Sequence, residues 1–530
     1  MKAQTILLAI FAFLFMGIGT LCASDTKDDY INSYFTLESL SDNNTVTLSI
    51  PESLTSEQLS WVASSTDGTN WTTMEIDGTL QYLTVVINQG EKVYFKGWGR
   101  QYCIDDAPSF CNFNATADYM VCGNIMSLLY GDDFASQTEL PAGSNYTFRG
   151  LFQQNNHLVS AENLMLPATE LVTWCYSYMF SDCTSLATAP ELPATNLAGC
   201  CYAYMFKDCS SLTTAPELRA SVLYNRCYFR MFKGCTSLTT THDLSATVLA
   251  DECCLEMFEG CASLTMAPAL PASTLSPFCY GFMFAGCTSL TEAPALPATA
   301  LEESCYYYMF AGCASLTEAP ELPAINLSHE CYESMFAGCT SLTEAPELPA
   351  TVLMYGCYKG MFGGCVSLTK SPVLPAPVLV FECYTGMFIR CSQLQKVTCL
   401  ATDISVVGCT YEWLESVAPS GTFYKAPEME DWPLNSVSGI PEGWNIGDYD
   451  AVDEQQEQIA VYPNPVVDRL HITGKDIQSV KVFDIQGRLV RSENCDRVSQ
   501  VDVDFQGCAD GVYSVSIQSE GGIVTRRVLF

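Results

Sequence analysis

The chain has 530 residues, 28 of them cysteine, and a formal net charge of −35 from 59 acidic and 24 basic residues. Binding to nucleic acid is excluded, because phosphate contacts need clustered Lys and Arg. The shortage of basic residues also argues against docking on anionic lipid. An acidic surface does keep a long exported protein soluble.

Residues 1–24 are predicted to be a secretory signal peptide. They combine a positively charged start, an apolar run over 6–18 and small residues at 22–23. The apolar run is too short for a membrane anchor, and Leu21 is unlike the small residue expected before a lipidated Cys22. No later stretch is apolar enough to span a bilayer, so we expect no membrane span in the mature protein.

Residues 25–125 are predicted to form an N-terminal β-rich domain resembling a small sandwich. Three short runs rich in β-branched and aromatic residues cover 46–50, 83–87 and 92–96. Turn signals containing Gly separate these runs.

A Met-Phe pair then recurs with an unbroken period of 26 residues. Its Met lies at Met179, Met205, Met231, Met257, Met283, Met309, Met335, Met361 and Met387. A fixed period of this length predicts a solenoid, in which each repeat is one coil stacked on the next. We assign residues 126–420 to the solenoid. Leu151-Phe152 is interpreted as a degenerate first coil, 28 residues ahead of the next, because a terminal coil must cover an open core.

Each coil has the same apolar columns, counted from its Met. In the coil of Met309 these are Cys305, Met309, Phe310, Cys313, Leu316 and Leu322. The columns are predicted to point inward and form the core. The Cys-Tyr-x-x-Met-Phe segment has the spacing of one turn and favours a short α-helix or 3₁₀ turn. The segment after Gly-Cys favours a short strand, which Pro ends because it cannot donate to a ladder.

Eighteen of the cysteines occupy the two columns four residues before and after Met. Eight residues of helix span about 12 Å, whereas a disulfide needs Cα atoms roughly 4.4–6.8 Å apart, so a bridge within one coil is unfavourable. Bridges between neighbouring coils would compete with a regular stack. We expect most repeat cysteines to be reduced and buried, and Cys103, Cys111 and Cys122 to be better candidates for bridges.

The repeat pattern decays after Met387. Residues 421–447 are predicted to be closing strands that cap the stack, and the polar stretch 448–458 is predicted to be a linker. Residues 459–530 carry seven short β-type runs and are predicted to form an antiparallel sandwich.

Carboxylates line up on the predicted outside of the stack. One column holds Glu292, Glu318 and Glu344, and a second holds Glu321 and Glu347, with Glu191 and Glu217 earlier in it. Stacked coils place such residues about 5 Å apart, where like charges repel by less than ~1 kcal/mol per pair in water. A merely solvated face is therefore one interpretation. A binding face for a basic protein partner or for Ca²⁺ is the other.

The sequence shows no recognisable catalytic or metal-binding constellation. The four His are scattered, and the Cys spacing is the repeat period and not a zinc spacing. Neither a Gly-x-Ser-x-Gly motif nor a phosphate loop is present. We therefore predict no enzyme activity, no metal site and no cofactor.

The coil resembles the BspA-like (Treponema-type) leucine-rich repeat of bacterial surface proteins, and residues 309–317 carry the match. The resemblance covers about 150–420. This chain departs from the family in its 26-residue repeat and in its Cys-Tyr pair. The predicted fold class is an α+β repeat solenoid of the leucine-rich-repeat type, with a short strand and a short helix per coil, flanked by two small all-β sandwich-like domains.

Residues 459–530 resemble the type A sorting domain of the type IX secretion system of Gram-negative Bacteroidota. The match rests on Tyr462, Pro463, Asn464 and Pro465, on the Asp-Ile-Gln-Gly-Arg motif at 484–488, and on Gly511 and Tyr513. The resemblance implies recognition by the secretion machinery, export through the outer membrane, removal of the tail and attachment to surface lipopolysaccharide. The expected location is the outer cell surface.

Export and a long regular face favour a surface adhesin or recognition protein that binds a host extracellular protein through the solenoid, as BspA-like relatives suggest. The second hypothesis is a carbohydrate- or mucin-binding protein that uses exposed aromatics such as Trp71 and Trp98. The third is a structural spacer without a ligand. The column containing Tyr280, Tyr306 and Tyr332 is more typical of packing than of a sugar platform.

Overall fold

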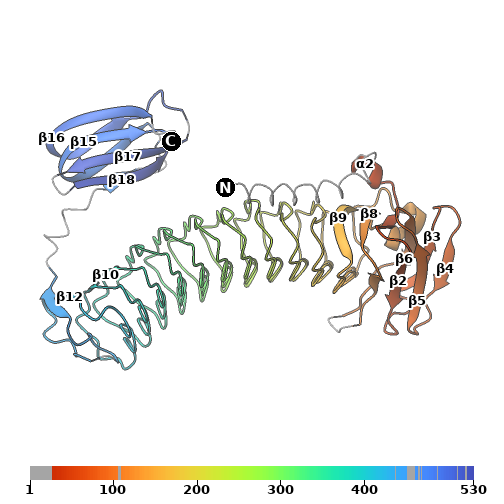
Figure 1. Ribbon diagram of the computed structural model, residues 1–530, viewed down its shortest axis with the longest axis horizontal. Helices are drawn as coiled ribbons and strands as arrows, with labels where there is room; N and C mark the ends of the chain where they lie inside the picture. Colours follow the sequence, from red (N-terminus) through yellow and green to blue (C-terminus); the bar gives the residue numbers. More distant parts are fainter. Residues whose placement is uncertain are drawn as a thin grey trace, which may run out of the picture. The chain divides into compact units, whose positions relative to one another are not determined.

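The structure is a computed structural model (Figure 1). It describes residues 27–105, 109–435, 437–449, 460–462, 466, 468–485, 488–509, 511–519 and 522–530. The predicted signal peptide, nearly all of the predicted linker, and Pro463, Asn464 and Pro465 lie outside these residues. The chain divides into two compact units, Met1–Gly447 and Asp448–Phe530.

The first unit begins with two β-sheets, one of six strands in the order β4-β3-β6-β1-β8-β9 and one of three in the order β5-β2-β7. The elements are α2 (Lys27–Tyr30), β1 (Phe35–Ser39), β2 (Asn44–Ile50), β3 (Leu59–Ser65), β4 (Thr72–Glu75), β5 (Gln81–Ile87), β6 (Lys92–Gly99), β7 (Asn112–Ala115), β8 (Tyr119–Asn124), α3 (Ser127–Tyr130), η1 (Gly131–Asp133) and β9 (Leu158–Met165). The three predicted strands lie within β2, β5 and β6. Buried and half-buried residues alternate along β2, and Phe35 of one sheet packs on Phe113 of the other with ring centroids 5.1 Å apart.

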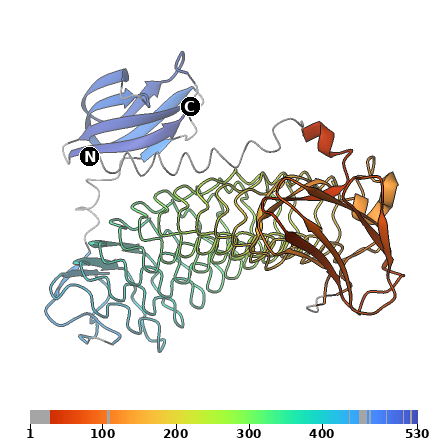
Figure 2. The same cartoon turned by 45° about the vertical axis from the view of Figure 1, so that its right-hand side comes forward.

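Strand β9 connects these sheets to the coils. It pairs in parallel with β8, and Ser160 forms a parallel bridge with Thr188 of the first regular coil. The ring of Phe152 stacks on that of Phe180 at 5.3 Å, and the amide of Phe152 donates to the carbonyl of Met179 at 2.9 Å. One hydrophobic core therefore runs from the N-terminal sheets through the coil array. Figure 2 shows the coils following directly on the N-terminal strands.

The predicted short helix in each coil is wrong. The described residues from 134 to 447 contain no helix, and each coil makes a run of tight turns in its place. Ser304, Tyr308 and Gly312 all have positive φ, at 51°, 53° and 76°. A left-handed residue at every fourth position ends each turn before an α-helix can propagate. Gly312 accepts this conformation without steric cost, because it has no Cβ.

The turns make backbone hydrogen bonds in two alternating directions. The amide of Met309 donates within its own turn, to the carbonyl of Tyr306 at 3.2 Å. The next amide, that of Phe310, donates to the carbonyl of Met335 in the following coil at 2.9 Å. Because half of the turn amides are satisfied only by a neighbour, one coil alone would leave them without a protein partner, and the array must fold cooperatively.

The predicted strand of each coil is reduced to a single bridge in most coils, such as the parallel pair Glu318 and Glu344. Six of the nine coils have two Pro residues after that point, the coil of Met205 has one, and the coil of Met231 has none. Pro cannot donate to a ladder. The coil of Met387 lacks both of these Pro residues. It forms the strand β11 (Lys396–Cys399), between β10 (Lys370–Leu374) and β12 (Thr422–Lys425).

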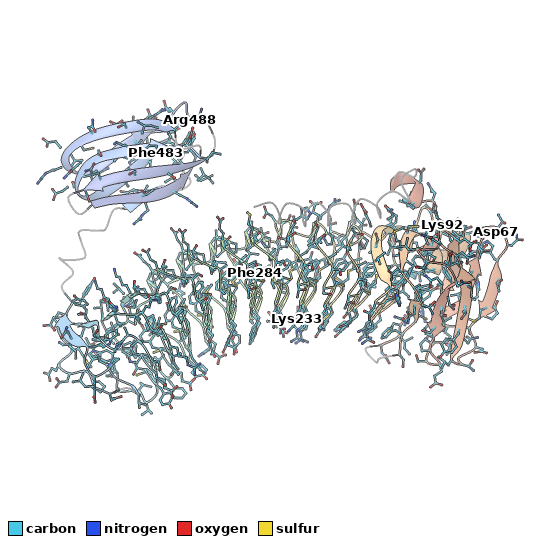
Figure 3. All side chains as sticks on the ribbon, in the orientation of Figure 1. Asp67, Lys92, Lys233, Phe284, Phe483 and Arg488 are labelled. Atoms are coloured by element: carbon cyan, nitrogen blue, oxygen red, sulfur yellow. The ribbon has the colours of Figure 1, made fainter. Side chains whose placement is uncertain are left out.

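The apolar columns fill the interior. Relative exposures are 0% for Cys305, Met309, Phe310, Cys313 and Leu316, and 3% for Leu322. The rings of the Phe column, which includes Phe284 in Figure 3, stack from coil to coil with centroids 5.3–5.7 Å apart and planes within 1–8°. The Tyr column is also internal, because Tyr280, Tyr306 and Tyr332 are only 1–2% exposed.

The eighteen cysteines of the two repeat columns are free thiols in the structure, and so are the bridge candidates Cys103 and Cys111. The column four residues after Met has a specific hydrogen-bonding role. The thiol of Cys313 donates to the carbonyl of Phe284 in the preceding coil at 3.1 Å, and all nine coils repeat the contact at 2.9–3.2 Å. A Cys side chain thus packs as a small apolar group and also links neighbouring coils.

A four-stranded sheet in the order β10-β11-β12-β13, the last strand being β13 (Asn445–Asp448), closes the C-terminal end of the array. Two Trp side chains cover the last interior positions. The indole N–H of Trp413 donates to the carbonyl of Gly439, and that of Trp444 donates to the carbonyl of Ala418, both at 2.8 Å. The end of the core is therefore covered by large side chains with satisfied polar atoms.

The second unit is one antiparallel sheet of β14 (Ala460–Tyr462), β15 (Arg469–Phe483), β16 (Leu489–Asp504), β17 (Val512–Ser519) and β18 (Gly522–Leu529). Five strands are described where seven were predicted. The long strands β15 and β16 stay paired through register irregularities between Thr473 and Ser479. Residues expected to be turns are therefore accommodated as bulges.

Candidate functional site

Five carboxylates form the surface that we call the acidic wall: Glu292, Glu318, Glu321, Glu344 and Glu347. All five side chains are exposed. The parallel bridge between Glu318 and Glu344 places neighbours in one column on adjacent coils, about 5 Å apart. In the same column Met266 precedes Glu292, and Lys370 and Lys396 follow Glu344, so the wall has defined ends.

None of the five wall carboxylates forms an ion pair with another residue that the structure describes. Carboxylates on the turns are different. Arg230 makes two hydrogen bonds to Glu256, at 2.8 and 2.6 Å, and Lys233, labelled at the edge of the array in Figure 3, contacts Glu259 at 2.6 Å. Several carboxylates on the turns are thus neutralised by Arg or Lys, whereas the five wall carboxylates have no such partner among the described residues.

Glu333 is a carboxyl on the turns with a strongly raised pKa. It is only 6% exposed, and burial raises its pKa to about 7. Lys359, with its amine 3.8 Å away, opposes that shift, and Glu330 and Glu382 add to it. Because the folded chain holds this proton more tightly than the unfolded chain, the contribution of Glu333 to the free energy of unfolding falls as the pH rises from about 4.5 to about 7.

Glu333→Gln is expected to stabilise the protein above pH 7, because the variant has no charge to bury. The gain should be about 1–3 kcal/mol at pH 8 and near zero at pH 4, given 1.36 kcal/mol per pKa unit. Urea unfolding at pH 4, 6 and 8 measures this, with the exposed Glu303→Gln as the control. An equal pH slope in parent and variant would show that Glu333 ionises normally.

A hollow of about 380 Å³ lies over the first coils, on the side that carries the two carboxylate columns. Its polar rim includes Glu162, Glu191, Glu217, Arg219 and His242, and its floor includes Ala189, Pro190, Ala215 and Pro216. Arg219 donates to Glu217 at 2.9 Å. Sequence reasoning placed Glu191 and Glu217 in a carboxylate column but missed the hollow, although loss of the usual Pro at 219 and 242 marks it.

The aromatic residues proposed for sugar binding differ in how exposed their rings are to solvent. Trp98 is 48% exposed. The face of Trp71 is covered, because the amine of Lys96 lies 4.2 Å from its ring centroid and the ring of Tyr34 packs 4.9 Å away. Tyr280 and its column neighbours are inside the core.

Among the described residues, no group of three His, Cys, Asp or Glu side chains is placed to hold a metal ion. No described helix has the length and hydrophobicity needed to cross a membrane.

The described sorting-motif residues Tyr462, Gly511 and Tyr513 lie along the second unit's sheet. Tyr462 of β14 pairs with His471 of β15. The backbone of Gly511 exchanges two hydrogen bonds with Phe530, at 2.8 and 3.0 Å. The hydroxyl of Tyr513, a buried residue of β17, donates to the carbonyl of Ala509 at 2.6 Å. The motif at Gly511 and Tyr513 therefore fixes the last strand pair.

Comparison with family models agrees with these two architectures. Residues 256–395 match the BspA type leucine rich repeat region in six copies. The coils over residues 256–395 are BspA-type leucine-rich repeats. Residues 460–530 match the secretion system C-terminal sorting domain. No curated protein matched the chain.

The BspA-type repeat and the sorting domain together identify an exported protein. The tail directs it through type IX secretion to the cell surface of a Bacteroidota-type bacterium, as predicted from its motifs. The secretion machinery is accordingly one partner of the chain.

Proposed function

We propose that this BspA-type protein is a surface recognition protein or adhesin that binds a basic segment of a host extracellular protein through the acidic wall. The carrying observation is that the five wall carboxylates are exposed and form no ion pair within the described structure. A rigid stack holds them at fixed spacing, so a partner with Lys or Arg at matching intervals pays little entropy to meet them.

Substitution of Glu318→Ala with Glu321→Ala is expected to weaken binding of the full-length protein to its partner by about 5- to 10-fold, or on the order of 1 kcal/mol. The partner is to be selected from a panel of purified extracellular matrix proteins and mucins. The affinity should also fall as salt rises, because exposed charges are screened.

The matched control is Glu302→Ala with Glu303→Ala. These two exposed carboxylates lie in the same coil and change the net charge equally. Equal weakening by both variants would indicate a diffuse charge effect, and no binding by the parent to any panel member would overturn the proposal.

A further inference from the structure

We infer that the hollow over the first coils binds a neutral saccharide. The coils serve as controls for one another, because each column has the same structural task in every coil. Seven of the nine coils have Pro eleven residues after Met, and at that position in the coil of Met231 stands His242. Six have Pro fourteen residues after Met, and at that position in the coil of Met205 stands Arg219. The other three positions without the usual Pro carry small residues, Ser245, Thr398 and Ala401, so Arg219 and His242 are the two large polar replacements.

Stability does not explain these two departures. A Pro in a compatible backbone position stabilises a protein by restricting the unfolded chain, and the other coils show that these positions accept it. The side chains of Arg219 and His242 are exposed, so they add nothing to the core. Both nevertheless line the same hollow, although they come from different coils.

The polar groups of the hollow disfavour an anionic ligand and suit hydroxyl groups. Glu162, Glu191 and Glu217 supply acceptors, and Arg219 and His242 supply donors. The guanidinium of Arg219 donates to Glu217 and offsets one of the three carboxylates, so the rim stays acidic and would repel an anion. Sugar hydroxyl groups can donate to the carboxylates and accept from Arg219 and His242.

The shape and the floor of the hollow agree with a sugar. A volume of about 380 Å³ lies within the range of ligand pockets, roughly 300–1,000 Å³. Ala189, Pro190, Ala215 and Pro216 present an apolar surface below the polar rim. The C–H face of a sugar ring would lie on this floor, with its hydroxyls toward the rim. This site is separate from the acidic wall and does not depend on it.

The test is calorimetric titration of the full-length protein with neutral mono- and disaccharides of glucose, galactose, mannose and N-acetylglucosamine. Glucuronate and glucosamine form the charged arms. We expect at least one neutral sugar to bind, and to bind more tightly than glucuronate. Arg219→Pro with His242→Pro restores the residues of the other coils, and should weaken that binding at least tenfold without lowering the melting temperature.

If the proline variant fails to fold, Arg219→Ala with His242→Ala replaces it, since both side chains are exposed. Glu318→Ala with Glu321→Ala should leave sugar binding unchanged, which separates this site from the acidic wall. Binding of charged sugars only, of no sugar, or equally by parent and double variant would overturn the inference.

Discussion

Deleting 26 residues, 299–324, is expected to leave a folded and slightly shorter solenoid. The deletion joins Ala298 to Ile325, so every column continues in register and each remaining coil keeps two neighbours. Stability in such an array is close to a sum of coil and interface contributions. The variant should therefore unfold cooperatively at nearly the parent's urea midpoint.

Deleting only thirteen residues, 312–324, is expected to be far more damaging. The shortened coil loses Cys313, Leu316 and Leu322 and cannot complete its circuit. At about 2–5 kcal/mol for each lost large core side chain, destabilisation should be at least about 6 kcal/mol. Urea unfolding of the two deletions compares them directly, and similar midpoints for both would contradict register-dependent stacking.

Phe310→Ala is expected to destabilise the protein by about 3–5 kcal/mol, because the ring is fully buried. It also removes two stacking contacts, with Phe284 and Phe336, at 5.6 and 5.7 Å. Such contacts contribute about 0.5–1.5 kcal/mol beyond area burial, so the upper half of the range is expected. The measurement is the urea unfolding free energy.

Ile325→Ala is the control for Phe310→Ala. Ile325 is also a large apolar residue of the array, but it is 58% exposed. Surface changes of this kind stay within about 0.5 kcal/mol. A loss below 1 kcal/mol for Phe310→Ala would contradict the claim that stacking in the Phe column stabilises neighbouring coils.

The 26-residue period was sufficient to predict a stacked array, because a repeating column of Phe or Leu can be buried only against its own copies. The BspA-type resemblance then supplied the repeat family, which the comparison confirmed. The same spacing could not distinguish a helix from the turns that the structure shows. Residues four apart, such as Cys305 and Met309, share a face in an α-helix, and they are also equivalent in successive four-residue turns.

The deciding feature is the left-handed backbone at Ser304 and Tyr308. Neither Ser nor Tyr favours a left-handed backbone, so their types do not predict it. Within this coil only Gly312 is of a type that does. The stacked neighbour supplies the missing energy, because the amides of Ser304 and Tyr308 both donate to the next coil, at 3.0 and 2.8 Å. This is a tertiary effect that local propensity does not contain.

The acidic wall and the hollow differ in how much of each could be predicted from the sequence. The 26-residue period alone places Glu318 and Glu344 at the same position of adjacent coils, so the acidic wall could be predicted from the sequence. The hollow needs side chains from β9 and three coils, and its shape depends on the small Thr188 and Thr214 in the column where later coils carry Glu. Only the departures at Arg219 and His242 hinted at it.

The central claim, that the coils stack with Cys, Met, Phe and Leu as continuous internal columns, is tested most directly by counting reactive thiols. Burial raises the pKa of Cys305 and Cys313 well above the usual thiol range, and reaction requires an exposed thiolate. Among the described cysteines we predict native labelling only at the partly exposed Cys200, Cys495 and Cys508, slowly at Cys200 because burial raises its pKa to about 11, and labelling of most repeat cysteines after denaturation. Native labelling of Cys305 and Cys313 at the rate of Cys200, or a denatured count near zero, would contradict the account.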